Sequence, residues 1–328
     1  MKLFNNPIHV SLLVAIVVCV STWAHAHPGD GLIIDKQGVI YFGWIHPFAG
    51  PEHHACIWKL DKQGDAHQVF KSQHSSRDAQ SSNIWISLGL DGHIYCLERQ
   101  YLGEEKERDV FVSDLWRLET GGKKMHILGP ERGRSPLGNS AFVVDRDGTI
   151  IHATNSHVID KRKPDGTKVT LAGGVRGHKD GTGDQAQFEH IASMAWGPND
   201  TLYVNDRGTI RLVSKAGTVT TLASGLAAFE NNGPVLLNQT HFFDMTIDSE
   251  GNVFGADWGS RRVLKVSSTG EVSTLYRCKP PWSPEGIALH GDVLYILETT
   301  FPESPTIRPR VRERKPNGTF STIFELSK

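Results

Sequence analysis

The chain has 328 residues, with 35 basic against 36 acidic side chains and a formal net charge of −1 at pH 7. Hydrophobic residues make up 38% of it and charged residues 22%, which argues against a disordered tail and against a protein that binds nucleic acid by charge. The 33 glycines exceed average usage and indicate many turns, which favours a β-rich fold.

Residues 1–26 have the pattern of a signal peptide. Lys2 gives the positive start, Val10–Val20 is an apolar run, and Ala24-His25-Ala26 has the small-residue pattern of a cleavage site. Cleavage fits after Ala24 or after Ala26. Because the apolar run is too short to cross a bilayer, we expect an exported protein, secreted or periplasmic, without a membrane span.

A repeated unit of strand, turn and strand occupies the rest of the chain. A turn followed by a strand rich in Ile, Tyr and Val recurs at 36–44, 90–98, 146–154, 198–206, 249–257 and 290–298. A second series of Gly turns, each with its own strand, recurs at 61–70, 120–128, 164–172, 215–223, 268–276 and 316–324. Both series have six members.

The spacing of this repeat predicts the architecture. Side chains alternate along the strands and the turns contain Gly with Asp or Asn, which indicates antiparallel hairpins. Each unit has about 50 residues, the length of a four-stranded propeller blade with its loops. We therefore predict an all-β fold, a single six-bladed β-propeller over 27–328. The predicted blades lie near 27–72, 81–129, 137–174, 187–225, 240–277 and 283–328.

One part of the repeat resembles a known family. Residues 171–223, with the segments LAGGVRGHKDGTGDQAQF, LYVND and GTVTTLA, resemble the NHL repeat. The likeness is specific over the fourth blade and good over the third and fifth, and in the other blades it rests mainly on the turns. It implies a relation to the senescence-marker/gluconolactonase-like and virginiamycin-lyase-like propellers, among which some are enzymes and many related domains only bind partners. The fold therefore does not settle the function.

Loop lengths predict where a site would lie. In such a ring, the loops from the second to the third strand of a blade and the loops between blades emerge on one mouth of the central channel. The former are long at 45–55, 99–114 and 300–310, and two long inter-blade loops, 173–189 and 224–240, stand opposite them. Because long loops on a rigid scaffold often carry binding residues, we expect a cleft over this channel mouth.

The ends of the six second strands give one equivalent position around the ring. It is occupied by Trp44, Glu98, Thr154, Asp206, Asp257 and Glu298. Converging carboxylates can hold a hard cation such as Ca²⁺ or bind a ligand that spans the mouth. The alternative is structural, because in NHL-like blades such an acid accepts bonds from backbone N–H groups and fixes the neighbouring loop.

Histidines give a second candidate site. His190 and His241 begin the innermost strands of neighbouring blades, and Glu285 lies near the start of the next innermost strand. Two adjacent imidazoles suit a transition metal such as zinc, and hydrogen bonding to loops is the alternative. The related peptidyl-hydroxyglycine lyases hold zinc with histidines from different blades, but a third equivalent histidine is missing here. The loop with His53 and His54 is a further metal candidate, or a solvated surface loop.

Three cysteines follow the signal segment, Cys56, Cys96 and Cys278, and their spacing does not choose among the three pairings of one disulfide. The chain has no phosphate loop, no G-x-S-x-G and no H-E-x-x-H.

These observations favour a binding module over an enzyme. We expect the channel mouth to bind a small molecule, peptide, glycan or protein surface, with the protein acting as a monomer. The expected ligand-binding residues are Trp44, Glu98, Asp206, Asp257, Glu298 and Glu285, and the expected metal ligands are His190 and His241, with Ca²⁺ or Zn²⁺ as the cation. The alternative is a metal-dependent hydrolase or lyase of the gluconolactonase or lyase type.

Overall fold

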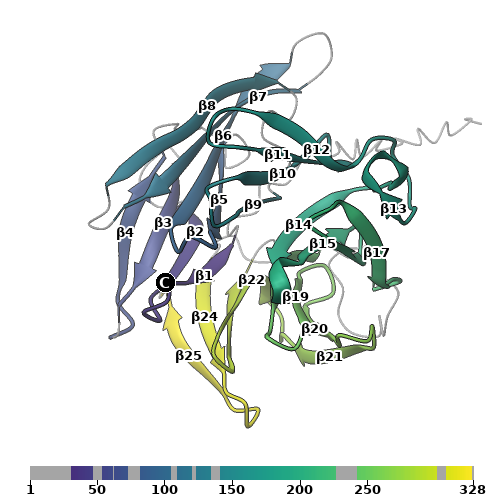
Figure 1. Ribbon diagram of the computed structural model, residues 1–328. Coiled ribbons are helices and arrows are strands. Elements are labelled where there is room, and N and C mark those ends of the chain that lie inside the picture. Colours follow the sequence, from purple (N-terminus) through teal and green to yellow (C-terminus); the bar gives the residue numbers. More distant parts are fainter. Residues whose placement is uncertain are drawn as a thin grey trace, which may run out of the picture.

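The computed structural model describes residues 31–46, 54–61, 63–72, 82–104, 109–119, 123–133, 141–226, 242–300 and 308–326. The predicted signal peptide and both residues His53 and His241 lie outside these ranges. The described strands form six antiparallel sheets arranged around a centre (Figure 1). This confirms the predicted six-bladed β-propeller.

The first three blades each contain four strands in sequential order. Blade 1 consists of β1 (Leu32–Ile34), β2 (Ile40–His46), β3 (His54–Leu60) and β4 (Ala66–Lys71). Blade 2 consists of β5 (Ser82–Leu88), β6 (Ile94–Glu104), β7 (Asp109–Leu118) and β8 (Lys124–Gly133). Blade 3 consists of β9 (Phe142–Val144), β10 (Ile150–Thr154), β11 (Val158–Arg162) and β12 (Lys168–Gly173).

The other three blades follow the same order, with one addition. Blade 4 consists of β14 (Ile191–Trp196), β15 (Leu202–Asp206), β16 (Thr209–Val213) and β17 (Thr218–Ala223), and β13 (Gly181–Thr182) pairs with the outer edge of β17. Blade 5 consists of β18 (Phe242–Ile247), β19 (Val253–Asp257), β20 (Arg262–Val266) and β21 (Val272–Arg277). Blade 6 consists of β22 (Ser283–His290), β23 (Val293–Thr299), β24 (Pro309–Arg314) and β25 (Phe320–Glu325).

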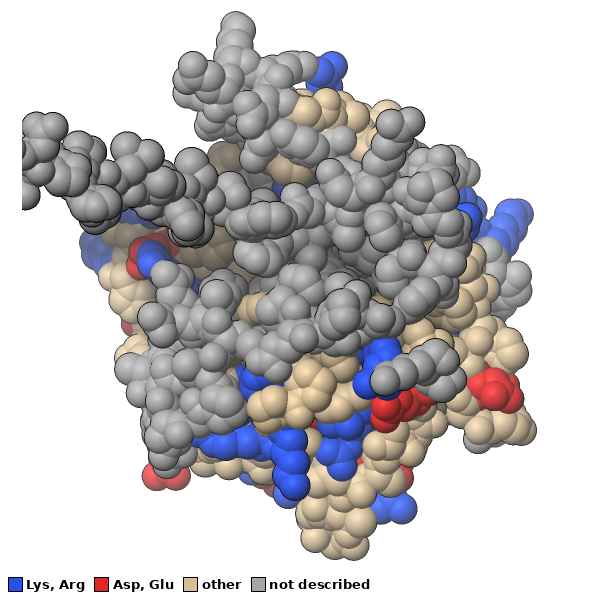
Figure 2. Space-filling model, turned by 180° about the vertical axis from the view of Figure 1, so that it is seen from behind, with Lys and Arg blue, Asp and Glu red and all other residues tan. Residues whose placement is uncertain are grey.

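Helical structure in the described residues is limited to two short 3-10 turns, η2 (Gly183–Gln185) and η3 (Pro198–Asp200). No described helix has the length and apolar character needed to span a membrane. Lys, Arg, Asp and Glu side chains share the face shown in Figure 2, in keeping with the near-zero net charge.

The tight turns between strands are stabilised by residues within the turn itself. In the first turn of blade 1, the Asp35 side chain accepts bonds from the backbone N–H groups of Gln37 and Val39, both at 2.9 Å, and Gly38 donates its own N–H to the Asp35 carbonyl. Gly38 has a φ of +79°, a conformation that glycine adopts without steric cost. An acidic residue three positions before a glycine therefore closes the hairpin.

The ring closes by packing. Leu32 and Phe42 of blade 1 share one buried cluster with Leu297 and Val311 of blade 6. Each blade is built from consecutive strands, and none of the described strands is exchanged between the first and last blades. Burying blade faces against neighbouring blades supplies the apolar burial that a single sheet lacks.

Two predicted loops are more ordered than expected. Residues 99–104 and 109–114 were expected within a long loop, but they extend β6 and β7 into a long hairpin. The Arg99 guanidinium lies 3.6 Å from the ring centre of Phe111, a contact between the two strands that stabilises the extension. The inter-blade loop at 173–189 also contributes β13 and η2.

Candidate functional site

The acidic position at the ends of the second strands is buried. Asp206 is 1% exposed, Glu98 is 2% exposed, and Asp257 and Glu298 are fully buried. A buried carboxylate needs partners that compensate for its lost hydration. Each of the four makes such contacts with protein groups, and the contacts follow one scheme.

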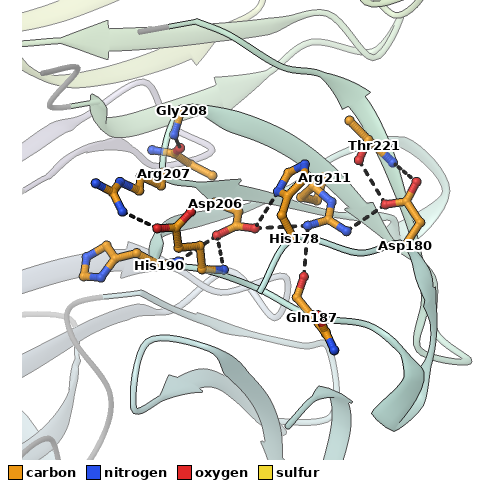
Figure 3. A network of polar contacts seen from close by, with 11 residues as sticks. His178, Asp180, Gln187, His190, Asp206, Arg207, Gly208, Arg211 and Thr221 are labelled. Atoms are coloured by element: carbon orange, nitrogen blue, oxygen red, sulfur yellow. Dashed lines mark hydrogen bonds and ion pairs between the residues drawn. The ribbon is translucent and has the colours of Figure 1, made fainter. Parts of the chain in front are cut away.

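Asp206 shows the scheme most completely (Figure 3). Its Oδ1 accepts the backbone N–H groups of Glu189 and His190, both at 2.8 Å, and its Oδ2 accepts from the Arg211 guanidinium at 3.0 Å. Arg211 also donates to the Gln187 carbonyl at 3.2 Å. The carboxylate binds N–H groups and the arginine binds a carbonyl of the same inter-blade segment, so the pair fixes the entry into blade 4.

The same network reaches the surface through Asp180. Arg211, whose side chain is fully buried, donates to Asp180 Oδ1 at 2.7 Å, and the Thr221 backbone N–H and hydroxyl also bind this carboxylate. The guanidinium beside it and the N–H and hydroxyl of Thr221 lower the pKa of Asp180 against the opposing effect of burial. His178 Nδ1 lies 3.6 Å from Asp206 Oδ2 at the outer side of the network.

Asp257 repeats the arrangement in blade 5. Its Oδ2 accepts from Arg262 Nε at 2.8 Å, its Oδ1 accepts the Ser260 N–H at 3.3 Å, and Arg262 donates to the Leu226 carbonyl at 2.9 Å. Leu226 belongs to the segment that leads from blade 4 toward blade 5. The Asp257–Arg262 pair therefore also binds the chain before its own blade.

Glu298 and Glu98 occupy the equivalent places in blades 6 and 2. Glu298 pairs with Arg310, whose Nε lies 2.6 Å from Oε2, and it accepts a bond from Cys278 Sγ at 3.4 Å. Glu98 accepts a hydrogen bond from the hydroxyl of Ser72, which directly follows β4 of the preceding blade. In both cases the carboxylate again contacts the segment that precedes its blade.

The remaining predicted site residues lie as follows. Trp44 is a core residue, 2% exposed, in the cluster between blades 1 and 6. His190 gives its backbone N–H to Asp206, but its imidazole points away from that carboxylate (Figure 3), and desolvation, then Arg176, lower its pKa. The described residues contain no group of three or more His, Cys, Asp or Glu placed to hold a metal ion. Cys56, Cys96 and Cys278 are buried, and no disulfide joins any two of them.

Sequence reasoning missed the arginine partners. Arg211 and Arg262 each lie five residues after their acid, at matching places in blades 4 and 5. This recurring spacing of Asp and Arg is visible in the sequence, and it would have favoured the structural role for the two aspartates.

An open cavity lies in the central channel. It has a volume of about 470 Å³ and is lined by all six innermost strands, β1, β5, β9, β14, β18 and β22. Its walls combine aromatic, cationic and acidic side chains, including Trp85, Trp196, Lys36, Arg146, Asp244 and Glu285. Of the predicted site residues that the structure describes, Glu285 lines this cavity.

The charges are separated along the channel. Lys36 and Arg146 lie in the turns after β1 and β9, whereas Asp244 and Glu285 lie near the starts of β18 and β22. The innermost strands of a propeller all run the same way along the axis, so the cations and the carboxylates lie toward opposite ends. Arg146 is also bonded to Asp200 at 2.7 Å, which holds its guanidinium at one end of the channel.

Asp244 joins three blades at the channel wall. Its carboxyl accepts backbone N–H groups from Met245 and Ile287, both at 2.9 Å, and from Leu32 of blade 1. Blades 6 and 1 approach each other closely there. A Cβ built on Gly286 would lie only 2.9 Å from the Leu32 Cβ, so this position needs a glycine. Burial raises the pKa of Asp244 to about 7, with the three backbone N–H groups opposing the shift. This carboxyl therefore exchanges its proton near neutral pH.

Glu285 is held beside this junction. It is 1% exposed, and its Oε1 accepts the Thr299 hydroxyl at 2.7 Å. The fixed carboxyl positions of Asp244 and Glu285, on adjacent innermost strands, give the channel an acidic end of defined geometry.

Comparison with known proteins identifies solved structures of the same fold. A streptogramin B lyase structure has a TM-score of 0.54 and 14% identity, covering 92% of this chain and 84% of that one. A virginiamycin B lyase from Staphylococcus aureus has a TM-score of 0.51 and 12% identity, covering 91% and 85%. A gluconolactonase from Xanthomonas campestris has a TM-score of 0.51 and 15% identity, covering 83% of each chain.

No protein-family model matches the chain, and no curated protein sequence matches it. The sequence identity to these structures is low, so the similarities show a common fold and do not assign the activity of any of these proteins to this chain. The chain is a six-bladed β-propeller of the architecture that these lyases and this gluconolactonase share.

Proposed function

We propose that the protein is a binding module for a polar small molecule, with the central channel as its binding site. The observation that carries this proposal is the cavity of about 470 Å³, which combines Trp85 and Trp196 with separated cationic and acidic side chains. Its size falls within the range of about 300–1,000 Å³ typical of small-molecule sites. The two tryptophan rings offer apolar contact, and the separated charges would orient a polar ligand along the axis.

The buried acids support this location over the ring of second-strand ends. Asp206, Asp257 and Glu298 already pair with arginines, so recruiting them for a ligand would break buried ion pairs. Leaving one partner of such a pair uncompensated costs about 3–5 kcal/mol. A ligand in the channel avoids that cost, because it contacts side chains of the innermost strands instead.

The test fills the channel. Ala192 lines the cavity on β14, and Ala192→Trp would occupy part of its volume. Thermal unfolding is measured with a panel of polar metabolites, because a ligand present at 100 times its Kd stabilises the folded state by about 2.7 kcal/mol. We expect at least one compound to raise the Tm of the native protein and of Val169→Trp, an exposed control on β12, but not of Ala192→Trp. Equal stabilisation of all three proteins would contradict the channel as the site.

A metal-dependent hydrolase or lyase is the second candidate, because the carboxyls of Asp244 and Glu285 line one cavity and carboxylates suit a divalent cation. Elemental analysis of purified protein after dialysis discriminates between the two functions. A stoichiometric metal that Asp244→Asn removes would favour the enzyme, and its absence would favour the binding module.

We also propose that the protein is exported to a secreted or periplasmic location and that its blades are of the NHL type. The signal-like pattern of residues 1–26 and the NHL-like segment 171–223 support these two proposals. N-terminal sequencing of the mature protein tests the first, since export predicts a chain that begins at His25 or His27.

A further inference from the structure

A second cavity lies on the outside of the ring, between blades 5 and 6. It has a volume of about 540 Å³ and is lined by Tyr276, Arg277, Lys279, Pro280, Trp282, Arg310, Arg312 and Thr322. We call it the basic groove. Four of its described lining residues are cationic and none is acidic. Its walls come from β21, the connection between blades 5 and 6, β24 and β25, so it is separate from the channel.

Strand alternation explains why the arginines gather here. The segment 308–314 reads RPRVRER, and in β24 the even positions 310 and 312 point to the side of blade 5. Val311, between them, is fully buried in the cluster with blade 1. Strand β24 therefore packs Val311 against blade 1 and presents the guanidinium groups of Arg310 and Arg312 to blade 5.

The guanidinium groups are held in place by aromatic rings. The Arg310 guanidinium carbon lies 4.0 Å from the Trp282 ring centre, and that of Arg312 lies 4.9 Å from the Phe320 ring centre. Trp282 is 8% exposed, and its carbonyl accepts a bond from the buried Arg261 at 2.8 Å, so its ring is a fixed support. Stacking on a ring leaves the edge N–H groups of a guanidinium able to hydrogen-bond, and those of Arg310 bind Glu298.

The charges of this groove are not all balanced by carboxylates. Arg310 is paired with Glu298, whereas Arg312 donates to the Tyr276 hydroxyl at 2.5 Å. The Nε of Arg312 is buried and has no acceptor among the described residues. Lys279, at the rim, is exposed and makes no ion pair with a described residue. Arg312 and Lys279 therefore carry positive charge that no described carboxylate balances, and this groove favours a ligand that supplies oxygen acceptors and negative charge.

We propose that the basic groove binds a small multivalent oxyanion, such as a phosphorylated, sulfated or polycarboxylate small molecule. The planar guanidinium of Arg312 matches the paired oxygens of such groups, Lys279 adds an exposed charge, and Arg310, which stays paired with Glu298, adds to the local positive field.

The test is calorimetric titration of the full chain with inorganic pyrophosphate, in a buffer of low ionic strength without other multivalent anions. We expect Arg312→Gln to weaken binding at least about tenfold and Lys279→Gln, at the rim, about threefold. Lys215→Gln removes an exposed charge in blade 4 and serves as the matched control, with affinity unchanged. Ala192→Trp also leaves the affinity unchanged, because the channel is a different cavity.

Three results would overturn the proposal: no heat of binding with the native protein, full affinity in both groove variants, or loss of pyrophosphate binding in Ala192→Trp. Lys279→Gln keeps the test decisive if Arg312→Gln does not fold, since its side chain is exposed and contributes little to the core.

Discussion

At the scale of single residues, the pairs of acid and arginine are structural clamps. Asp206 and Arg211 bind N–H and carbonyl groups of the segment before blade 4. Arg262, which is paired with Asp257, binds a carbonyl of the segment before blade 5. Charged side chains buried this deeply are retained only with good hydrogen-bonding geometry. The clamps fix where blades 4 and 5 begin relative to the blade before each of them.

Arg211→Met tests this role. The variant leaves the buried Asp206 without its cation, so we expect a loss of about 3 kcal/mol in the free energy of unfolding. Urea denaturation measures the loss. Arg146→Met is the control, because Arg146 is 64% exposed and its ion pair with Asp200 contributes less than about 1 kcal/mol. Similar small losses in the two variants would show that the Asp206–Arg211 pair is not a clamp.

The carboxyl of Asp244 predicts a pH dependence. In the folded protein its pKa is raised from 3.8 to about 7 by burial. Between pH 3.8 and about pH 7 the folded state binds more protons at Asp244 than the unfolded state does. The contribution of Asp244 to stability is therefore greatest below pH 3.8. The free energy of unfolding then falls as the pH rises toward about 7, by at most on the order of 1 kcal/mol per pH unit.

Urea denaturation at a series of pH values checks this contribution. The side chain of Asp244→Asn cannot ionise. We therefore expect the native protein to gain stability relative to this variant as the pH is lowered from about 7 to about 4. A difference that does not vary with pH would show that Asp244 does not titrate in this interval.

The sequence allowed only part of the residue scale to be predicted. Aligned strands placed Glu98, Asp206, Asp257 and Glu298 at one position, and the alternative of bonds to backbone N–H groups describes Asp206 and Asp257. The arginine partners were overlooked, although their spacing recurs. Asp244 gave no signal, because its environment is created by Ile287 and Leu32 from two other blades.

At the scale of elements, turns lock neighbouring blades together. A Cβ built on Gly217 would lie 2.2 Å from the Leu171 carbonyl oxygen of blade 3, and one on Gly270 would lie 2.4 Å from the Leu222 carbonyl oxygen of blade 4. Gly64 makes the same approach to Ile323 of blade 6, at 2.8 Å. The junction between blades 1 and 6, which closes the ring, therefore has the same contact of a turn glycine with a carbonyl oxygen as the junctions between blades 3 and 4 and between blades 4 and 5.

Gly217→Ala tests this contact against a matched turn. Gly217 and Gly166 have similar φ values, +81° and +86°, in equivalent turns, but a Cβ on Gly166 would meet nothing within 4 Å. Both alanines bear backbone strain of about 1–3 kcal/mol, and Gly217→Ala adds a steric cost of similar size against blade 3. We expect Gly217→Ala to have the lower Tm in thermal unfolding. Equal Tm values for the two variants would show that a Cβ at position 217 causes no loss of stability through its contact with blade 3.

The elements were largely predictable, because turn residues and strand alternation are local signals. The β6–β7 extension was the exception. Its charged segment around 104–108 reads as a loop, whereas the pairing of residues on either side depends on contacts such as Arg99 with Phe111 across the hairpin. β13 was also missed, since two residues at a sheet edge carry no periodic pattern.

At the scale of the whole molecule, the channel cavity is a product of ring geometry. Each innermost strand contributes a few side chains, and the space left between them depends on how six blades pack. The sequence predicted a site at the loop-walled mouth, but no local pattern predicts a cavity within the channel. The separation of Lys36 and Arg146 from Asp244 and Glu285 is likewise visible only once the strands share one axis.

The central claim is that a ligand occupies this channel, and hydroxyl-radical footprinting tests it most directly. The compound that raises the Tm most in the metabolite panel is added, and oxidation of individual side chains is followed by mass spectrometry. The account predicts slower oxidation of Trp85 and Trp196, which line the cavity, and an unchanged rate at Met125, which is 45% exposed on β8. Unchanged rates at both tryptophans in the presence of that compound would contradict it.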